Sequence, residues 1–247
     1  MKKLLLGIAA VCLAGFTFAQ DAPLWMRHSV ISPDGTTIAF TYKGDIYTVP
    51  VAGGRAMQIT TNPAYDTAPV WSPDSKRIAF ASDRMGSLDV YIVAKDGGEP
   101  RRLTTHSGSE TPLAFTDAGH VLFSAGIMPS AEAVVFPSNG QFNQVYRVSV
   151  EGGRPTMISS MPMECISINK EGAMLYQDKK GYEDYWRKHH VSPIARDIWM
   201  YTPGKEPQYR QLTTFGGEDR EPVWAPDGKT FYYLSEENGS FNIYRRT

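Results

Sequence analysis

The chain has 247 residues, of which 42% are hydrophobic and 21% are charged, and its formal net charge is −1. This composition is ordinary for a soluble globular protein. It shows no basic excess that would indicate nucleic-acid binding and no acidic run that would indicate a disordered tail.

The first segment, MKKLLLGIAAVCLAGFTFAQ, is typical of a cleaved secretory signal peptide. Lys2 and Lys3 give a positive start, and the apolar run from Leu4 to Phe16 is too short for a comfortable membrane span. Small residues one and three positions before Gln20 predict cleavage there. We therefore expect residues 1–19 to be removed and the protein to be exported, periplasmic or secreted, with no membrane attachment after cleavage. An uncleaved anchor is the alternative.

Cleavage leaves Cys165 as the only cysteine. One cysteine forms no internal disulfide and no cysteine-based zinc site. Because it lies in the apolar run MECISI, we expect a small buried hydrophobic side chain rather than a nucleophile.

One phrase occurs three times, as ISPDGTTIAF (31–40), WSPDSKRIAF (71–80) and WAPDGKTFYY (224–233). A polar turn follows it, then Asp-Val/Ile-Tyr, a pair of glycines and a closing Leu/Ile-Thr-Thr. Repeats of about 40 to 55 residues indicate solenoids, propellers or arrays.

Each repeat predicts four strands, which in the second repeat are residues 69–72, 77–82, 89–94 and 101–104. Ser72 to Ser75 forms a turn in which proline presets the backbone, and we expect its Ser and Asp side chains to bond the backbone rather than to catalyse. Ile78 and Phe80 lie on one face of their strand, and small alanines lie on the other. A sheet that is apolar on both faces needs a neighbour on each side, and radial stacking supplies this in a β-propeller.

The sequence therefore predicts an all-β fold, a β-propeller of four-stranded antiparallel blades. Residues 20–247 form an incomplete propeller whose blades span about 25–61, 66–105, 109–160, 163–214 and 219–247. The last repeat stops after its third strand. We therefore expect about four complete blades and a partial fifth of a six-bladed ring, as the front part of a longer chain.

Two oversized connections interrupt the pattern, at residues 126–143 in blade three and 179–197 in blade four. Tyr, Trp and Arg are favoured interface anchors, so the second connection is our candidate for peptide or partner contact. A structural insertion held by its own ion pairs is the alternative, and a metal site is disfavoured because adjacent histidines usually diverge. The candidate residues are Tyr182, Tyr185, Trp186, Arg187, His189, His190 and Arg196.

Catalytic signatures are absent from the sequence. There is no G-x-S-x-G, H-E-x-x-H, G-x-G-x-x-G or P-loop pattern. We assign no catalytic residue, no metal ligand and no cofactor.

The phrase WSPDSKRIAFASDR with its D-V-Y and G-G-E-P-R-R-L-T resembles the PD40 repeat. That repeat is shared by the TolB propeller, tricorn-type peptidases and some prolyl-oligopeptidase relatives. Two stretches are similar to tricorn protease homologs: IAFTYKGDIYTVPVAGGRAMQIT to their first blade, and GYEDYWRKHHVSPIARDIW to a long loop of their fourth. The resemblance covers nearly all of Pro23 to Thr247.

The resemblance implies a six-bladed N-terminal propeller followed by a second propeller, a PDZ domain and an S41-type serine-peptidase core. The catalytic residues lie mostly in those later domains. This chain would then be a non-catalytic module that gates or filters peptides. Its implied partners are downstream domains of the same polypeptide, peptides and, as an open alternative, further copies of itself. A TolB-like protein-binding scaffold and the propeller of a prolyl-oligopeptidase-type hydrolase are the competing hypotheses, although TolB-like proteins place an α/β domain ahead of the propeller.

Overall fold

A computed structural model describes residues 24–126, 143–180 and 193–247. Within these ranges the chain forms five antiparallel sheets, which we call blades one to five in chain order. Four have four strands, and the fifth has three. No helix in the described ranges is long and apolar enough to cross a membrane.

The strands of each blade follow one another in sequence order. Blade one contains β1 (Arg27–Ile31), β2 (Thr37–Tyr42), β3 (Asp45–Pro50) and β4 (Met57–Gln58). Blade two contains β5 (Asp66–Trp71), β6 (Arg77–Ser82), β7 (Asp89–Ala94) and β8 (Arg101–Arg102). Blade three contains β9 (Glu110–Asp117), β10 (His120–Ala125), β11 (Gln144–Ser149) and β12 (Thr156–Ser159). Blade four contains β13 (Met163–Ile168), β14 (Met174–Asp178), β15 (Ile198–Thr202) and β16 (Gln208–Gln211). Blade five contains β17 (Asp219–Trp224), β18 (Phe231–Ser235) and β19 (Asn242–Arg246).

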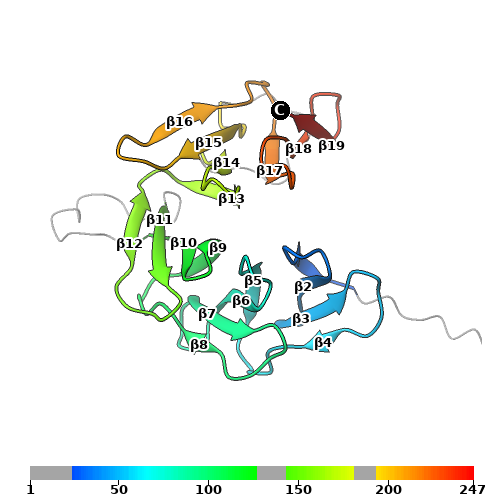
Figure 1. The fold of residues 1–247 in the computed structure, drawn as a ribbon, viewed down its shortest axis with the longest axis vertical. Helices are drawn as coiled ribbons and strands as arrows, with labels where there is room; N and C mark the ends of the chain where they lie inside the picture. The colour runs from blue at the N-terminus through cyan, green and yellow to red at the C-terminus, as the bar shows by residue number, and fades with distance from the viewer. Residues whose placement is uncertain (1–23, 127–142, 181–192) are drawn as a thin grey trace, which may run out of the picture.

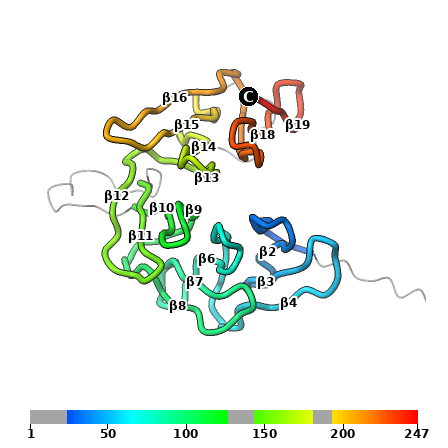
Figure 2. The backbone as a smooth tube through the Cα atoms, viewed as in Figure 1, coloured from blue at the N-terminus to red at the C-terminus, as the bar shows by residue number. Residues whose placement is uncertain are grey.

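The blades are arranged around a common centre (Figure 1). The first strands of blades two to five lie toward this centre, and the fourth strands β4, β8, β12 and β16 lie at the periphery. The backbone trace passes from blade to blade in one direction around the ring (Figure 2). This is the radial arrangement expected of a propeller.

The hydrophobic core lies between neighbouring blades. Ile46 of blade one packs in one cluster with Ile78 and Phe80 of blade two, and all three are fully or almost fully buried. Three further clusters join blades two and three, three and four, and four and five in the same way. Burial contributes roughly 25 cal/mol per Å² of apolar surface, so each blade is stabilised by its neighbours, as the two-faced apolar pattern predicted.

An aromatic pair recurs inside the blades and explains part of the repeated phrase. Phe80 lies directly opposite Tyr91 in the β6–β7 register, and their ring centroids are 5.9 Å apart. The same stacking joins Phe40 to Tyr47 and Phe123 to Tyr146. The Phe of the phrase and the Tyr of Asp-x-Tyr are therefore cross-strand partners.

The strand predictions in the second repeat are mostly confirmed. β6 and β7 have the expected bounds. The inner strand is longer than expected, because β5 begins at Asp66, and the outer strand is shorter, because β8 ends at Arg102. The chain after β8 is held by other bonds: the Leu103 N–H donates to the Val90 carbonyl, and the Val90 N–H donates to the Thr104 hydroxyl.

The expected blade count is wrong. We predicted four complete blades and part of a fifth from a six-bladed ring, but the structure shows five blades in a ring. Blade five packs on blade four through Phe231 and Tyr233, and its inner strand lines the same central cavity as the other inner strands. The physical reason is that the first three strands carry these contacts, so a three-stranded sheet serves as a blade. A repeat predicts how one blade packs on the next but does not specify the number around the ring.

Candidate functional site

A central cavity lies where the inner strands of the blades meet. Its volume is about 1180 Å³, and the inner strands of all five blades line it. Apolar side chains such as Ile31, Val70 and Val223 form much of the wall, and Lys170 and Glu171 add charge where the β13–β14 turn reaches it. A cavity of this kind, mostly apolar with a few polar groups, is the usual form of a binding site.

Four of the five inner strands share a backbone irregularity. His28, Ala68, Cys165 and Glu221 all have positive φ, between 50° and 52°, and each lies at a register shift in its strand pair. Such bulges bend a strand and re-aim its side chains. Cys165 and Glu221 both line the cavity, so the bulges help shape its wall.

Cys165 differs from the sequence expectation in its burial. It is exposed rather than buried, because the bulge brings it to the cavity wall. Desolvation by the surrounding protein still raises the pKa of the thiol to about 11, and the negative charges of Glu221 and Glu164 add to this effect. The thiol therefore stays protonated at neutral pH.

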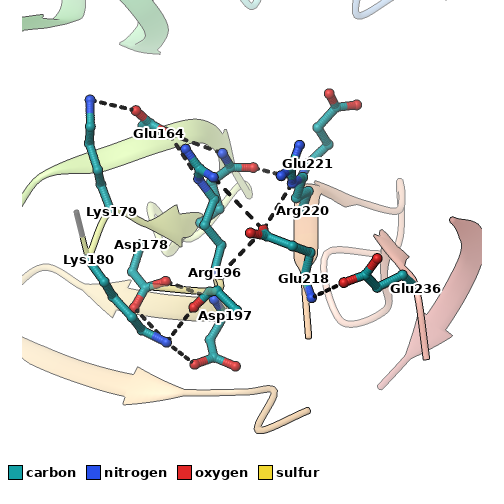
Figure 3. Close-up of polar contacts among 12 residues, drawn as sticks. Glu164, Asp178, Lys179, Lys180, Arg196, Asp197, Glu218, Arg220, Glu221 and Glu236 are labelled. Carbon is teal, nitrogen blue, oxygen red and sulfur yellow. Dashed lines mark hydrogen bonds and ion pairs between the residues drawn. The ribbon is translucent and has the colours of Figure 1, made fainter. Parts of the chain in front are cut away.

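A junction charge cluster lies where blades four and five meet, at the base of the 179–197 connection (Figure 3). Lys180 Nζ lies 2.5 Å from Asp197 Oδ2 and also donates to the Ala195 carbonyl at 2.7 Å. The Asp197 N–H donates to Asp178 Oδ1 at 2.8 Å. The two ends of the connection are thus tied to each other. The cluster comprises Glu164, Asp178, Lys179, Lys180, Arg196, Asp197, Glu218 and Arg220.

Arg196 joins the two blades through this cluster. Its Nε lies 3.4 Å from Glu164 Oε2 on blade four, and its Nη1 lies 3.9 Å from Glu218 Oε2 beside blade five. Arg220 Nε reaches the same Glu218 oxygen at 3.0 Å. Only 12% of the Arg196 side chain is exposed. Of the predicted contact residues, Arg196 is therefore placed as an ion-paired anchor, which is the role that the structural-insertion alternative gave it.

Electrostatics within the cluster follow from its partial burial. Burial raises the pKa of Asp178, although the Asp197 N–H and the Lys180 ammonium oppose this. Burial lowers the pKa of Lys180, but its bonds to Asp197 and Asp178 outweigh that effect and leave the pKa above its ordinary value. Lys180 is therefore firmly cationic and serves as the counterion of two acids.

The other predicted contact residues, Tyr182, Tyr185, Trp186, Arg187, His189 and His190, lie outside the described residues. Their role stays a prediction. In the described ranges no group of three or more His, Cys, Asp or Glu side chains is arranged to hold a metal ion. Sequence reasoning missed the bulge positions, because they share no residue type that would have indicated a bulge.

The fold and the cavity define a β-propeller. A match to the tricorn protease N-terminal beta propeller domain covers residues 23–247, so the chain belongs to that family. It is 25% identical over 224 residues to tricorn protease homolog 1 of Streptomyces coelicolor, which covers 90% of this chain and 20% of the relative.

Two solved structures show the same fold. The crystal structure of the tricorn protease aligns with a TM-score of 0.70 and 19% identity, covering 91% of this chain and 21% of that one. A putative TolB from Agrobacterium tumefaciens aligns with a TM-score of 0.68 and 16% identity, covering 91% and 76%. The chain spans between 20% and 31% of the length of the curated relatives it matches.

Proposed function

We propose that this chain is the non-catalytic N-terminal propeller module of an exported, tricorn-like serine peptidase, and that its central cavity receives peptides. The observation that carries the proposal is the cavity itself, lined by the inner strands of all five blades. Its largely apolar wall suits extended peptide segments, whose side chains alternate between apolar and polar contacts. The family membership supports a peptidase as the parent protein.

The catalytic core in this proposal lies outside the chain. The module acts by gating or filtering: it admits peptides that fit the cavity and holds back folded protein, which cannot enter about 1180 Å³. The isolated chain should accordingly hydrolyse no peptide.

The test narrows the cavity in the parent peptidase. Ile31→Trp and Val223→Trp enlarge two side chains that line the cavity and are more than half exposed, so the fold should tolerate both. We expect kcat/KM for long peptides to fall about tenfold, equivalent to ~1.4 kcal/mol, while a short chromogenic substrate is little affected.

Val51→Trp is the matched control, because Val51 is 45% exposed and lies outside the cavity lining. Unchanged kinetics for long peptides in both cavity variants would overturn the proposal.

Export is part of the same proposal and rests on the pattern of Lys2, Lys3 and the apolar run that follows. Mass spectrometry of the protein recovered outside the cytoplasm should show a mature N-terminus at or near Gln20. Intact Met1 in a cytoplasmic fraction would refute it.

A further inference from the structure

Pairs of acidic side chains recur at the junctions between blades. In each pair one residue stands at the start of the third strand or immediately before it, and the other opens the inner strand of the next blade. Their backbones are in contact: the Asp66 N–H donates to the Gly44 carbonyl at 2.7 Å, and the Glu110 N–H donates to the Leu88 carbonyl at 2.7 Å. The pairs are Asp45 with Asp66, Asp89 with Glu110, and Asp197 with Asp219.

The junction of blades three and four has no such pair. The corresponding positions, the first residues of β11 and β13, are Gln144 and Met163. This junction forms without an acid, so the acids are not a general requirement for blade packing. It also provides an internal reference within the same molecule.

The junctions differ in where the positive charge lies. At the first junction Arg84 contacts Asp66, the acid on the inner strand, at 2.7 Å. At the second junction Arg102 contacts Asp89, the acid on the third strand, at 2.9 Å. At this second junction the cation Arg102 is therefore paired with Asp89. The inner-strand acid, Glu110, is left without it.

Glu110 is also fully buried. Its relative exposure is 0%, and neither carboxyl oxygen has a hydrogen-bond partner among the described residues. The groups that face it are the Asp89 carboxylate from β7, the Thr104 hydroxyl and the His106 backbone, with Arg102 of β8 beyond Asp89. A buried carboxylate without a counterion is costly, and the group avoids that cost by holding its proton.

The direction of the electrostatic effect agrees with this geometry. Burial raises the pKa of Glu110 to about 7, the Thr104 hydroxyl and His106 N–H oppose the rise, and the Asp89 charge adds to it. His106 itself is exposed, and its ring nitrogen accepts from the Gly108 N–H at 3.0 Å, so its imidazole faces away from this pair.

We propose that the junction of blades two and three is a proton-dependent latch, in which the buried Glu110 carboxyl stays neutral while β9 packs against blade two. Deprotonation releases the proton to solvent and leaves Glu110 as a buried carboxylate without a counterion, because Arg102 is paired with Asp89. An unpaired carboxylate is costly to bury, so β9 loosens from blade two.

The sign of the pH effect follows from linkage. The pKa of Glu110 is higher in the closed junction than in an open one, where it has its ordinary value of 4.5. The closed junction therefore binds more protons between these two values, and its stability falls as pH rises through about 7. The latch is closed in acid and weakened above neutrality.

Hydrogen exchange of the full chain, measured by mass spectrometry, tests the latch. Peptides that contain Leu88 to Val93 and Leu103 to Thr111 report on the bonds across this junction. After correction for the intrinsic pH dependence of exchange, we expect their protection factors to fall about tenfold or more between about pH 5 and about pH 8. Peptides that contain β11 and β13 should show no such fall. Equal protection at both pH values at the second junction would overturn the proposal.

Substitutions assign the effect to Glu110. Glu110→Gln keeps the shape without a titrating proton and should make the protection independent of pH, whereas Glu99→Gln at an exposed position should behave as the wild type. Persistence of the pH effect in Glu110→Gln would contradict the latch. If that variant does not fold, Asp89→Asn serves in its place, because removal of the neighbouring charge should reduce the pH effect, and an undiminished effect would again contradict the proposal.

Discussion

The aspartate of the repeated Ser-Pro-Asp turn shows what the repeated phrase does at the scale of single residues. The Ser72 hydroxyl donates to Asp74 Oδ1 at 2.6 Å, and the Ser32 hydroxyl donates to Asp34 Oδ1 at the same distance. In blade five, Asp227 accepts from the Lys229 and Thr230 N–H groups, and these bonds hold its pKa at about 2. The expectation that these side chains bond the backbone of the turn is confirmed.

The buried ion pair of Arg84 with Asp66 is a second feature at the scale of single residues. The Arg84 Nη2 lies 2.7 Å from Asp66, the exposures of the two side chains are 11% and 0%, and the guanidinium lies over the rings of Phe80 and Tyr91. Arg84→Met should lower the free energy of unfolding by roughly 3 to 5 kcal/mol, because it leaves a buried carboxylate unpaired. Urea denaturation measures this.

The matched control is Arg101→Met. Arg101 also pairs with an acid at 2.7 Å, but the exposures are 48% and 74%. An exposed pair contributes about 0 to 1 kcal/mol. Equal losses in the two variants would show that burial does not decide the contribution of these pairs.

At the scale of elements, the sequence predicted the strands well where packing alternates and poorly where the backbone bends. The bounds of β6 and β7 follow from the pattern of Ile78, Phe80 and their alanine neighbours. The bulges in β1, β5, β13 and β17 were not predicted, because positive φ falls on residues as different as His28, Ala68, Cys165 and Glu221. Tertiary packing imposes the positive φ at these positions, so the local residue preferences in the sequence do not predict it.

Ala68 permits a direct test of that strain. A left-handed conformation costs a non-glycine residue about 1 to 2 kcal/mol, and glycine's extra freedom in the unfolded chain offsets part of the gain. Ala68→Gly should therefore raise the free energy of unfolding by up to about 1 kcal/mol. Ala39→Gly in β2, a fully buried position without positive φ, should lower it. A loss of stability in both variants would mean that the bulge is not strained.

At the scale of the whole molecule, the repeat predicted the propeller and its resemblance to tricorn protease homologs but not the number of blades. Ring size depends on the angle between neighbouring blades, which is set by side-chain volumes along the whole junction rather than by the repeated phrase. For the same reason, the repeated phrase did not predict the central cavity in detail. The candidate contact residues of the 179–197 connection were chosen by residue type, and of these the structure places Arg196, in an ion-paired position between blades.

The central claim is that peptides enter the cavity lined by the five inner strands. Photo-crosslinking tests it most directly, with an extended peptide that carries a benzophenone group and with the attachment sites mapped by mass spectrometry. We predict attachment to cavity-lining segments, 29–31, 112–117, 165–172 and 221–223, and its loss in Val223→Trp. Attachment confined to the peripheral strands β4, β8, β12 and β16, or attachment that Val223→Trp leaves unchanged, would contradict the account.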